Sequence, residues 1–497
     1  NNVPMTKSSA VWDISDNVAK SIERHMLKFG ADVQFIRPGT FATMRGRGSF
    51  GFTGVFTQNP QGRPRTGSAA ADLLLGTANA LNTGTTTESA ERGRYVGLYF
   101  QDEWSATRSL TFTLGMRYDL FYPYTEVENR MANFILDPGD PLFGSFIVAG
   151  DPRKPRSLLA LDKNNWGPRV GFAWRVPGIK DMVVRSSYGI FFAQDTGLGV
   201  IDRMTGNPPF YGYGSVSVIS DQLFPSTGYV LSSGAPVPRS APVDPEQFVL
   251  DPSSTAPLRS WHQRYTQPYT QQWNFNIQKQ LPWNLIWQTS YVGNMGVHIW
   301  GNSEGNQPLV NGPGSPTNRR PLATYTRASV GTLAPWNRSA YHGMSSRLEK
   351  RFGIGVSFGA SFTYGRAIDL QNMGINVGGA PGDAVQNAYD RKSQRGPSDN
   401  HVPLRFAFSG VWDLPFGPGH RFANRGWLGA VVGSWQLSAI YQAQSGPAFS
   451  VMLPFDNANS GTANRPDRIC SGRLSDPTLM RYYNTACFAT PPQYQFG

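Results

Sequence analysis

The chain has 497 residues, with 45 lysines and arginines against 33 aspartates and glutamates, which gives a net charge of +12. No apolar run approaches the roughly 18 residues that a membrane-spanning helix needs, so a helical membrane protein is excluded. The basic residues are scattered and form neither a basic helix nor an RNA-binding aromatic signature, so no nucleic-acid partner is expected.

The composition predicts a chain of many short strands joined by many turns. Glycine occurs 54 times and proline 38 times, and 13% of the residues are aromatic. Alternation of apolar and polar residues predicts about thirteen strands, with more hidden in the long segments between them. The expected strands are 10–14, 24–36, 48–57, 94–104, 110–118, 168–175, 182–194, 271–280, 284–300, 341–350, 354–364, 404–414 and 433–441, and residues 71–76 are a candidate for a further, buried strand.

The clearest strand, 354–364, alternates without a break. Its odd and even positions separate into two faces, because successive side chains of a strand leave opposite sides. One face is apolar (Ile354, Val356, Phe358, Ala360, Phe362, Tyr364) and the other is small and polar (Gly355, Ser357, Gly359, Ser361, Thr363). Its length of roughly eleven residues suits a tilted strand that crosses a bilayer, with Phe358 toward lipid and Ser361 toward a lumen.

The connections between the strands alternate in length along the chain. Short turns at 105–109, 176–181, 281–283 and 351–353 alternate with long polar segments at 121–166, 195–267, 301–340 and 366–401. Outer-membrane barrels show this pattern because their periplasmic turns are tight and their extracellular loops are long. The sequence therefore predicts an all-β, antiparallel transmembrane β-barrel with a water-filled lumen, and a sheet that is incomplete as given.

The sequence contains short patterns associated with catalysis and phosphate binding, but the elements expected around them do not fit those functions. Gly355–Gly359 (GVSFG) matches a nucleophile elbow, but Ser357 is expected within a strand rather than at a strand-to-helix turn. Gly46–Gly51 (GRGSFG) matches a phosphate-binding pattern, but no helix is expected after it. The six histidines never show metal-ligand spacing and no carboxylate pair stands out. We expect no enzyme activity, no catalytic residue, no metal and no cofactor.

The long segments contain aromatic and arginine side chains that could bind a ligand. Aromatic faces stack on sugars or peptides, and the guanidinium group of arginine binds carboxylates. The alternative is that these residues belong to interface girdles or pack the loops. The ligand-binding candidates are Tyr211, Tyr213, Trp261, Arg264, Trp300 and Trp336, with Phe210, Arg319 and Arg320 near them.

The two cysteines, Cys470 and Cys487, both fall in the last stretch of the chain. In an exported protein, two cysteines this close in sequence form one small disulfide loop. The alternative is a pair of free thiols.

Ordered segments along nearly the whole chain resemble the Oar-like TonB-dependent outer-membrane transporters. They include HMLKFGADVQF, YVGLYFQDEWSATRSLTFTLGMRYDL, WGPRVGFAW, YTQQWNFNIQKQL, SYVGNMGVHIW, LEKRFGIGVSFGASFTYGRAID, DLPFGPG and GSWQLSAIYQAQSGPAFS. The resemblance implies a barrel of about 22 strands with a plug, a TonB contact segment and a carboxypeptidase-regulatory-like domain ahead of it. We expect residues 1–497 to be part of the barrel domain, with those N-terminal parts and the last hairpins outside this sequence.

The resemblance implies energy-coupled uptake, or export, of a ligand through a plugged barrel in the outer membrane. The expected partners are outer-membrane lipid, a TonB-type energy-coupling protein that acts through the N-terminal part, and an unidentified small ligand, oligosaccharide or peptide. The alternative is an outer-membrane barrel with a structural or adhesive role at the cell surface.

Overall fold

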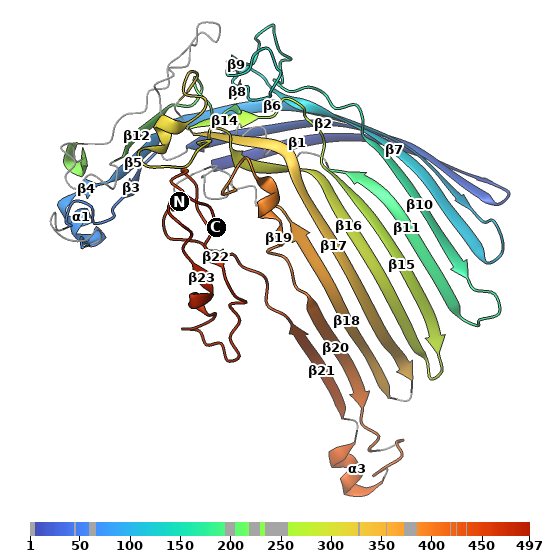
Figure 1. The fold of residues 1–497 in the computed structure, drawn as a ribbon. Helices are drawn as coiled ribbons and strands as arrows, with labels where there is room; N and C mark the ends of the chain where they lie inside the picture. The colour runs from blue at the N-terminus through green and yellow to red at the C-terminus, as the bar shows by residue number, and fades with distance from the viewer. Residues whose placement is uncertain are drawn as a thin grey trace.

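One large antiparallel sheet dominates the computed structural model (Figure 1). The structure describes residues 5–43, 46–58, 66–193, 204–217, 229–233, 257–326, 329–353, 355–371, 385–417, 419–423, 425–433 and 435–497. The sheet has 14 strands, and its main path follows chain order. That path is β1 (Met5–Ile22), β2 (His25–Thr43), β6 (Thr86–Trp104), β7 (Leu110–Glu126), β10 (Trp166–Arg175), β11 (Met182–Phe192), β15 (Tyr269–Leu281), β16 (Leu285–Glu304), β17 (Val330–Gly353), β18 (Val356–Asp369), β20 (Leu404–Asp413) and β21 (Gln436–Gln444).

The sheet forms a curved, open wall. Each neighbouring pair on the path is antiparallel, as hairpin connections require. In the described part of the chain, β1 and β21 each pair with one neighbour on the path, so the wall does not close into a ring. A short strand, β14 (Leu258–Trp261), pairs in parallel with β17, and β19 (Gly396–Pro397) pairs with β18.

The two ends of the wall differ in the way predicted from the connection lengths. Tight turns join β6 to β7, β10 to β11 and β15 to β16 at one end, which we call the turn end. The long connections gather at the other end as a loop layer (Figure 1). The loop layer contains β3 (Ser49–Gly51), α1 (Ala69–Leu75), β4 (Thr77–Ala78), β5 (Ala80–Gly84), β8 (Ala132–Phe134), β9 (Phe146–Val148), β12 (Tyr213–Ser217), β13 (Tyr229–Val230) and β14.

The register separates the wall into an outer face and an inner face. Phe100 pairs with Met116, Leu114 with Val170 and Phe362 with Phe406, so apolar side chains lie next to one another across strands. These outer-face side chains are solvent-exposed in the isolated chain: Leu98, Phe100, Leu114, Met116, Val170, Phe275, Met344, Phe362, Phe406 and Leu437. A continuous apolar surface of this extent marks a contact with lipid.

The largest fully buried side chains of the described residues, such as Trp261, Tyr265 and Phe134, lie in the loop layer. Two clusters form its core, one around Met131, Trp261 and Trp300 and the other around Phe134, Leu258 and Val330. The wall has no second sheet packed on its apolar face among the described residues. A soluble sandwich would bury that face against a second sheet.

Three local predictions were wrong. Residues 71–76 were expected to form a buried strand, but they lie in α1, where the Ser68 side chain accepts a hydrogen bond from the Ala71 N–H and Gly76 ends the helix with a φ of 73°. The leucines of α1 point to solvent, and Leu74 is 89% exposed. Of 48–57, only Ser49–Gly51 is a strand. The turn expected at 351–353 lies further along the chain, because β17 runs to Gly353 and β18 begins at Val356.

The connection between β20 and β21 also departs from the predicted alternation. It lies at the turn end, yet it contains a helix, α3 (Gly426–Val432) (Figure 1). The prediction placed the start of the following strand at residue 433, whereas β21 begins at Gln436. No helix among the described residues is long and apolar enough to cross a bilayer.

Opposite faces of β18 predict opposite responses to arginine. Phe358 lies on the outer face, with its ring centroid 6.3 Å from that of Phe408, whereas Ser361 lies on the inner face beside Ala407. We expect Phe358→Arg to lower the free energy of unfolding in lipid vesicles by about 2–4 kcal/mol, because it places a charge in hydrocarbon. The matched variant Ser361→Arg should leave it nearly unchanged. Equal losses in the two variants, measured by urea titration of the vesicle-embedded protein, would contradict this assignment of faces.

Candidate functional site

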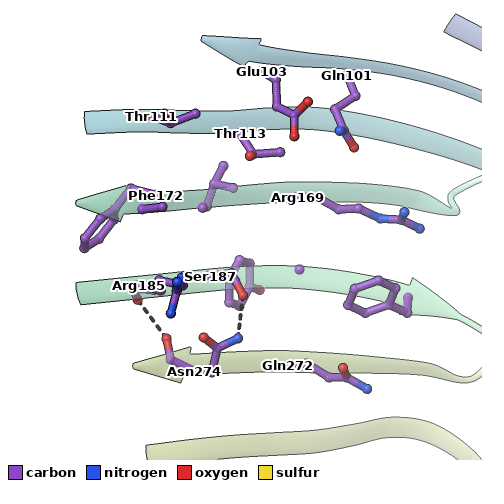
Figure 2. A pocket seen from close by; sticks show the side chains of 17 residues that line it. Gln101, Glu103, Thr111, Thr113, Arg169, Phe172, Arg185, Ser187, Gln272 and Asn274 are labelled. Carbon is purple, nitrogen blue, oxygen red and sulfur yellow. Dashed lines mark hydrogen bonds between the residues drawn. The ribbon is translucent and has the colours of Figure 1, made fainter. Parts of the chain in front are cut away.

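The inner face contains a hollow of about 500 Å³ near the middle of the wall (Figure 2). Five strands, β6, β7, β10, β11 and β15, contribute to it, because alternate residues of each point to the same side. Amides and hydroxyls supply most of its polar groups, and Glu103 is the one carboxylate in its lining. The side chains that define it are Gln101, Glu103, Thr113, Arg169, Arg185, Ser187, Gln272 and Asn274.

The hollow carries an excess of positive charge. Lys28 contacts Glu103 at 3.2 Å and offsets the single carboxylate. Arg185 donates to the side-chain oxygen of Gln278 at 2.9 Å, and Arg169 places its guanidinium 4.7 Å from the ring centre of Phe191. Among the described residues, neither arginine forms an ion pair with a carboxylate. Two guanidinium groups in a polar recess can bind carboxylate or other anionic groups of a ligand.

A buried polar network braces the wall beside this hollow. Arg117 donates to Asp119 at 2.8 Å and also to the hydroxyl of Tyr95, which in turn donates to the same carboxylate at 2.6 Å. Asp32 lies 3.7 Å from the Arg117 guanidinium on the other side. The network ties β2, β6 and β7 together through side chains. A Cβ at Gly97 would lie 2.3 Å from the Tyr95 hydroxyl, so any larger residue there would displace the side chains of this network.

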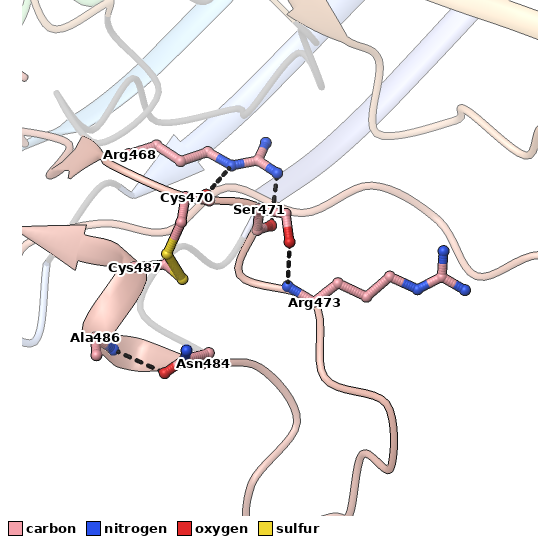
Figure 3. The surroundings of a disulfide bond; sticks show 7 residues. All are labelled: Arg468, Cys470, Ser471, Arg473, Asn484, Ala486 and Cys487. Carbon is pink, nitrogen blue, oxygen red and sulfur yellow. Dashed lines mark hydrogen bonds between the residues drawn. A yellow bond between two sulfur atoms is a disulfide. The ribbon is translucent and has the colours of Figure 1, made fainter.

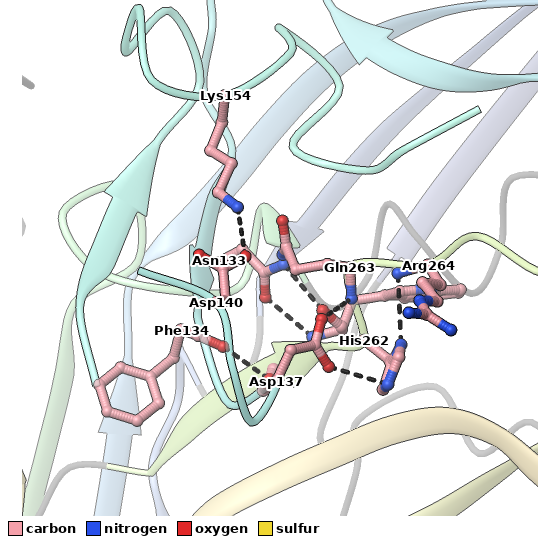
Figure 4. A network of polar contacts seen from close by, with 10 residues as sticks. Asn133, Phe134, Asp137, Asp140, Lys154, His262, Gln263 and Arg264 are labelled. Carbon is pink, nitrogen blue, oxygen red and sulfur yellow. Dashed lines mark hydrogen bonds and ion pairs between the residues drawn. The ribbon is translucent and has the colours of Figure 1, made fainter. Parts of the chain in front are cut away.

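Side-chain amides hold the segments of the loop layer together (Figure 4). The Asn133 amide donates to the carbonyl of Trp261 at 2.9 Å and accepts from its N–H at 2.8 Å, so one side chain satisfies both backbone groups. Asn207 makes the same paired contact with Arg259, at 2.9 Å in each direction. These amides replace the sheet ladder where β14 passes β8.

Charged groups support the same region. Asp137 accepts from the Gln263 N–H at 2.7 Å and lies 2.8 Å from His262 Nε2. Lys154 contacts Asp140, and this hydrogen bond lowers the pKa of the Asp140 carboxyl (Figure 4). Because the folded-state pKa is lowered, the contact stabilises the fold above the unfolded-state pKa, and its contribution is lost as the pH falls.

Trp261 and Trp300, two of the predicted ligand-binding residues, come together in the core of the loop layer. Their ring centroids are 4.8 Å apart in an edge-on arrangement, and Tyr265 packs against both. Trp261 is only 2% exposed. Both side chains therefore take the loop-packing role that the sequence left open as the alternative, and the structure shows no open ring face on Trp261 for a ligand.

The other four predicted residues are not part of that buried core cluster. Trp336 is half-buried, donates to the Gly301 carbonyl at 2.9 Å and has the Arg391 guanidinium 5.0 Å from its ring centre. Arg264 is exposed, beside the core. Tyr211 is half-buried, with its N–H bonded to the Asn207 carbonyl at 3.0 Å. Tyr213 begins β12, and its side chain lies outside the described residues. Ligand binding by these residues stays a prediction.

Cys470 and Cys487 are joined by a disulfide, with their Cα atoms 4.9 Å apart (Figure 3). The bond closes the loop 470–487 in the segment that follows β21, and the paired strands β22 (Asp467–Arg468) and β23 (Phe488–Ala489) flank this loop. Arg468 donates to the carbonyls of Cys470 and Ser471 at 3.0 and 2.6 Å. The crosslink and these contacts fix the base of the closed loop.

The motifs considered for catalysis and metal binding have no matching geometry. Ser357 lies in β18 and pairs with Val411, so no strand-to-helix turn presents it. Gly46 and Gly48 precede the short strand β3 rather than a helix. In the part of the chain that the structure describes, no group of three or more histidine, cysteine, aspartate or glutamate side chains is placed to hold a metal ion.

Comparison with known proteins agrees with the wall geometry. The sequence profile of the outer membrane beta barrel domain matches residues 1–497. The chain belongs to this family, and the protein is an antiparallel β-barrel protein of the outer membrane. No curated protein sequence matches the chain.

Solved structures with a similar fold include three outer-membrane proteins. The outer membrane transporter YddB from Escherichia coli has 10% identity and a TM-score of 0.48, with 93% of this chain and 47% of that chain covered. FpvA of P. aeruginosa bound to heterologous pyoverdines has 13% identity and a TM-score of 0.38, with 86% and 37% covered. The FrpB iron transporter from Neisseria meningitidis has 10% identity and a TM-score of 0.37, with 83% and 41% covered. The chain spans less than half the length of each of them.

The Asn133 amide gives a test of how the loop layer is held. Asn133→Ala removes both hydrogen bonds to Trp261 and leaves two buried backbone groups unpaired, which costs about 1–3 kcal/mol. We expect faster hydrogen exchange at residues 258–261, with little change in the sheet. Asn164→Ala, at an exposed asparagine of the same layer, is the matched control. Unchanged exchange at 258–261 in Asn133→Ala would contradict the assigned role.

Proposed function

We propose that the protein is the barrel region of a TonB-dependent outer-membrane transporter, which takes up a ligand by energy-coupled transport. The observation that carries the proposal is the polar inner face with its cationic hollow. A barrel that served only as a rigid support has no need of two arginines without carboxylate partners facing its lumen. The proposal assigns the chain no catalytic role.

The inner face supports the proposal through its charge and its hydrogen-bonding groups. Arg169 and Arg185 face the lumen from adjacent strands, beside the amides of Gln272 and Asn274. A ligand with carboxylate or other anionic groups would find donors on several strands at once. The resemblance of the sequence to Oar-like transporters supports the same function.

The loop layer supports a role in gating access to the lumen. It is a packed body with its own hydrophobic core, so it holds a fixed shape at the cell surface. The ligand-binding candidates that are not fully buried, Arg264, Trp336 and Tyr211, belong to this layer. In the proposal, the layer captures the ligand and the inner face guides it inward.

The second candidate is a structural or adhesive role at the cell surface. The observation that favours it is the burial of Trp261 and Trp300, because a loop layer built to bind a small ligand would present such rings to solvent. A rigid outer body is suited to gripping a surface or a matrix. The two candidate functions differ in one respect: transport requires the polar side chains of the inner face, whereas adhesion does not.

Removal of the two lumen arginines separates these candidates. Cells that express the whole protein are incubated with conditioned growth medium, and the compounds they remove are measured by mass spectrometry. We expect the wild type to deplete at least one anionic compound, and the double variant Arg169→Gln/Arg185→Gln to deplete it at least tenfold more slowly. Arg153→Gln, at an exposed loop arginine, is the control and should match the wild type.

Energy coupling is tested in the same assay. Collapse of the proton gradient, or deletion of the TonB-type partner, should abolish depletion in the wild type. Depletion that is absent from every strain, together with unchanged attachment of the cells to surfaces in the double variant, would contradict transport and favour the adhesive role.

A further inference from the structure

The connection between β20 and β21 differs from the other turns at its end of the wall. Instead of a tight turn, it contains α3, and the side chains of Trp427 and Val431 on this helix are exposed. Trp427 is 74% exposed and Val431 is 61% exposed, and the two residues are four apart, so they share one face of the helix. Phe416, Phe422 and Trp435 add exposed apolar surface to the same connection.

The connection continues the lipid-facing surface of the wall. Trp412 pairs with Leu437 on the outer face, and the Leu414 N–H donates to the Trp435 carbonyl at 2.8 Å, which extends that ladder past the end of the strands. Trp435 lies two residues before Leu437, so in the extended chain its side chain faces outward with that of Leu437. Its indole N–H donates to the Val431 carbonyl at 2.8 Å and so ties the end of α3 to the outer face.

The charges of the connection are all positive. Residues 414–435 include Arg421 and Arg425 and contain no aspartate or glutamate. Arg421 and Arg425 are exposed, and the Arg421 guanidinium lies 5.5 Å from the ring centre of Phe422. Aromatic rings combined with arginines are typical of a segment that lies in the headgroup region of a bilayer.

An isolated helix of seven residues is marginal in water, so α3 needs a partner that covers its apolar face. No described residue buries Trp427 or Val431. We propose that α3 is an interfacial anchor that lies on the periplasmic leaflet of the outer membrane, with Trp427 and Val431 in the acyl boundary and Arg421 and Arg425 on anionic phospholipid headgroups. The anchor fixes the depth of the β20–β21 hairpin in the bilayer.

The test uses the full chain reconstituted in bilayers, with a nitroxide spin label at Trp427→Cys or, in a second variant, at Val431→Cys. Cys470 and Cys487 are joined and do not compete for the label. We expect collisions with oxygen to exceed collisions with a water-soluble nickel chelate several-fold at both sites. Lys180→Cys, in the exposed turn between β10 and β11 at the same end, is the control and should show the reverse ratio. Labels in water at both α3 sites would overturn the proposal and leave a protein partner as the occupant.

The headgroup contact is tested by comparing bilayers of phosphatidylcholine alone with equal parts phosphatidylcholine and phosphatidylglycerol. The label at 427 should move deeper in the anionic bilayer. The double variant Arg421→Gln/Arg425→Gln should lose this shift while keeping its depth in phosphatidylcholine. If the protein that keeps Arg421 and Arg425 shows the same label depth in the two bilayers, the assignment of anionic lipid is overturned.

Discussion

The structure depends on one constraint, which is that a backbone crossing hydrocarbon must satisfy its own hydrogen bonds. A sheet meets this requirement only by pairing strand with strand, and each strand then presents alternate residues to lipid and to water. The register of β6, β7 and β10 obeys this rule, with Phe100, Met116 and Val170 on the outer face and Gln101, Arg117 and Arg169 on the inner face. The same alternation that places the wall in the membrane also supplies the polar inner face on which the proposed transport depends.

The loop layer is organised by different physics, because it is surrounded by water. There the chain builds a closed hydrophobic core from Trp261, Trp300 and their neighbours, and uses buried amides such as Asn133 where strand pairing is missing. The wall and the layer therefore divide two tasks. The wall provides a boundary of fixed polarity, and the layer provides a fixed shape above it.

Much of the wall could be predicted from the sequence, because a period of two residues is a local signal. The alternation at 354–364 predicted which side chains of β18 lie on the outer face, including Phe362. The lengths of the connections predicted which end of the wall carries the loops. Helix α1 was missed because a short apolar run fits a buried strand or a helix equally well, and the Ser68 and Gly76 caps decided between them. The first residues of β17 were missed because loop segments cover that part of the strand, which removes the alternation.

The candidate site was only partly accessible to sequence analysis. The polar faces of the strands were recognised as a lumen wall, but the hollow depends on the register that sets Arg169 opposite Gly189 and Arg185 opposite Ala173. Trp261 contacts Trp300 across two segments that are separate in sequence, and no local sequence pattern predicts this contact. Ligand candidates chosen by residue type in the loops therefore included rings that the fold uses for packing.

The most direct test of the account is the accessibility of the two ends of the wall in intact cells. Single cysteines at exposed positions, Val310→Cys in the loop layer and Lys180→Cys in the β10–β11 turn, are treated with a membrane-impermeant maleimide. The account predicts labelling of position 310 in intact cells and labelling of position 180 only after the outer membrane is permeabilised. Labelling of position 180 but not of position 310 in intact cells would contradict the orientation, and equal labelling of both would contradict a wall that spans the membrane.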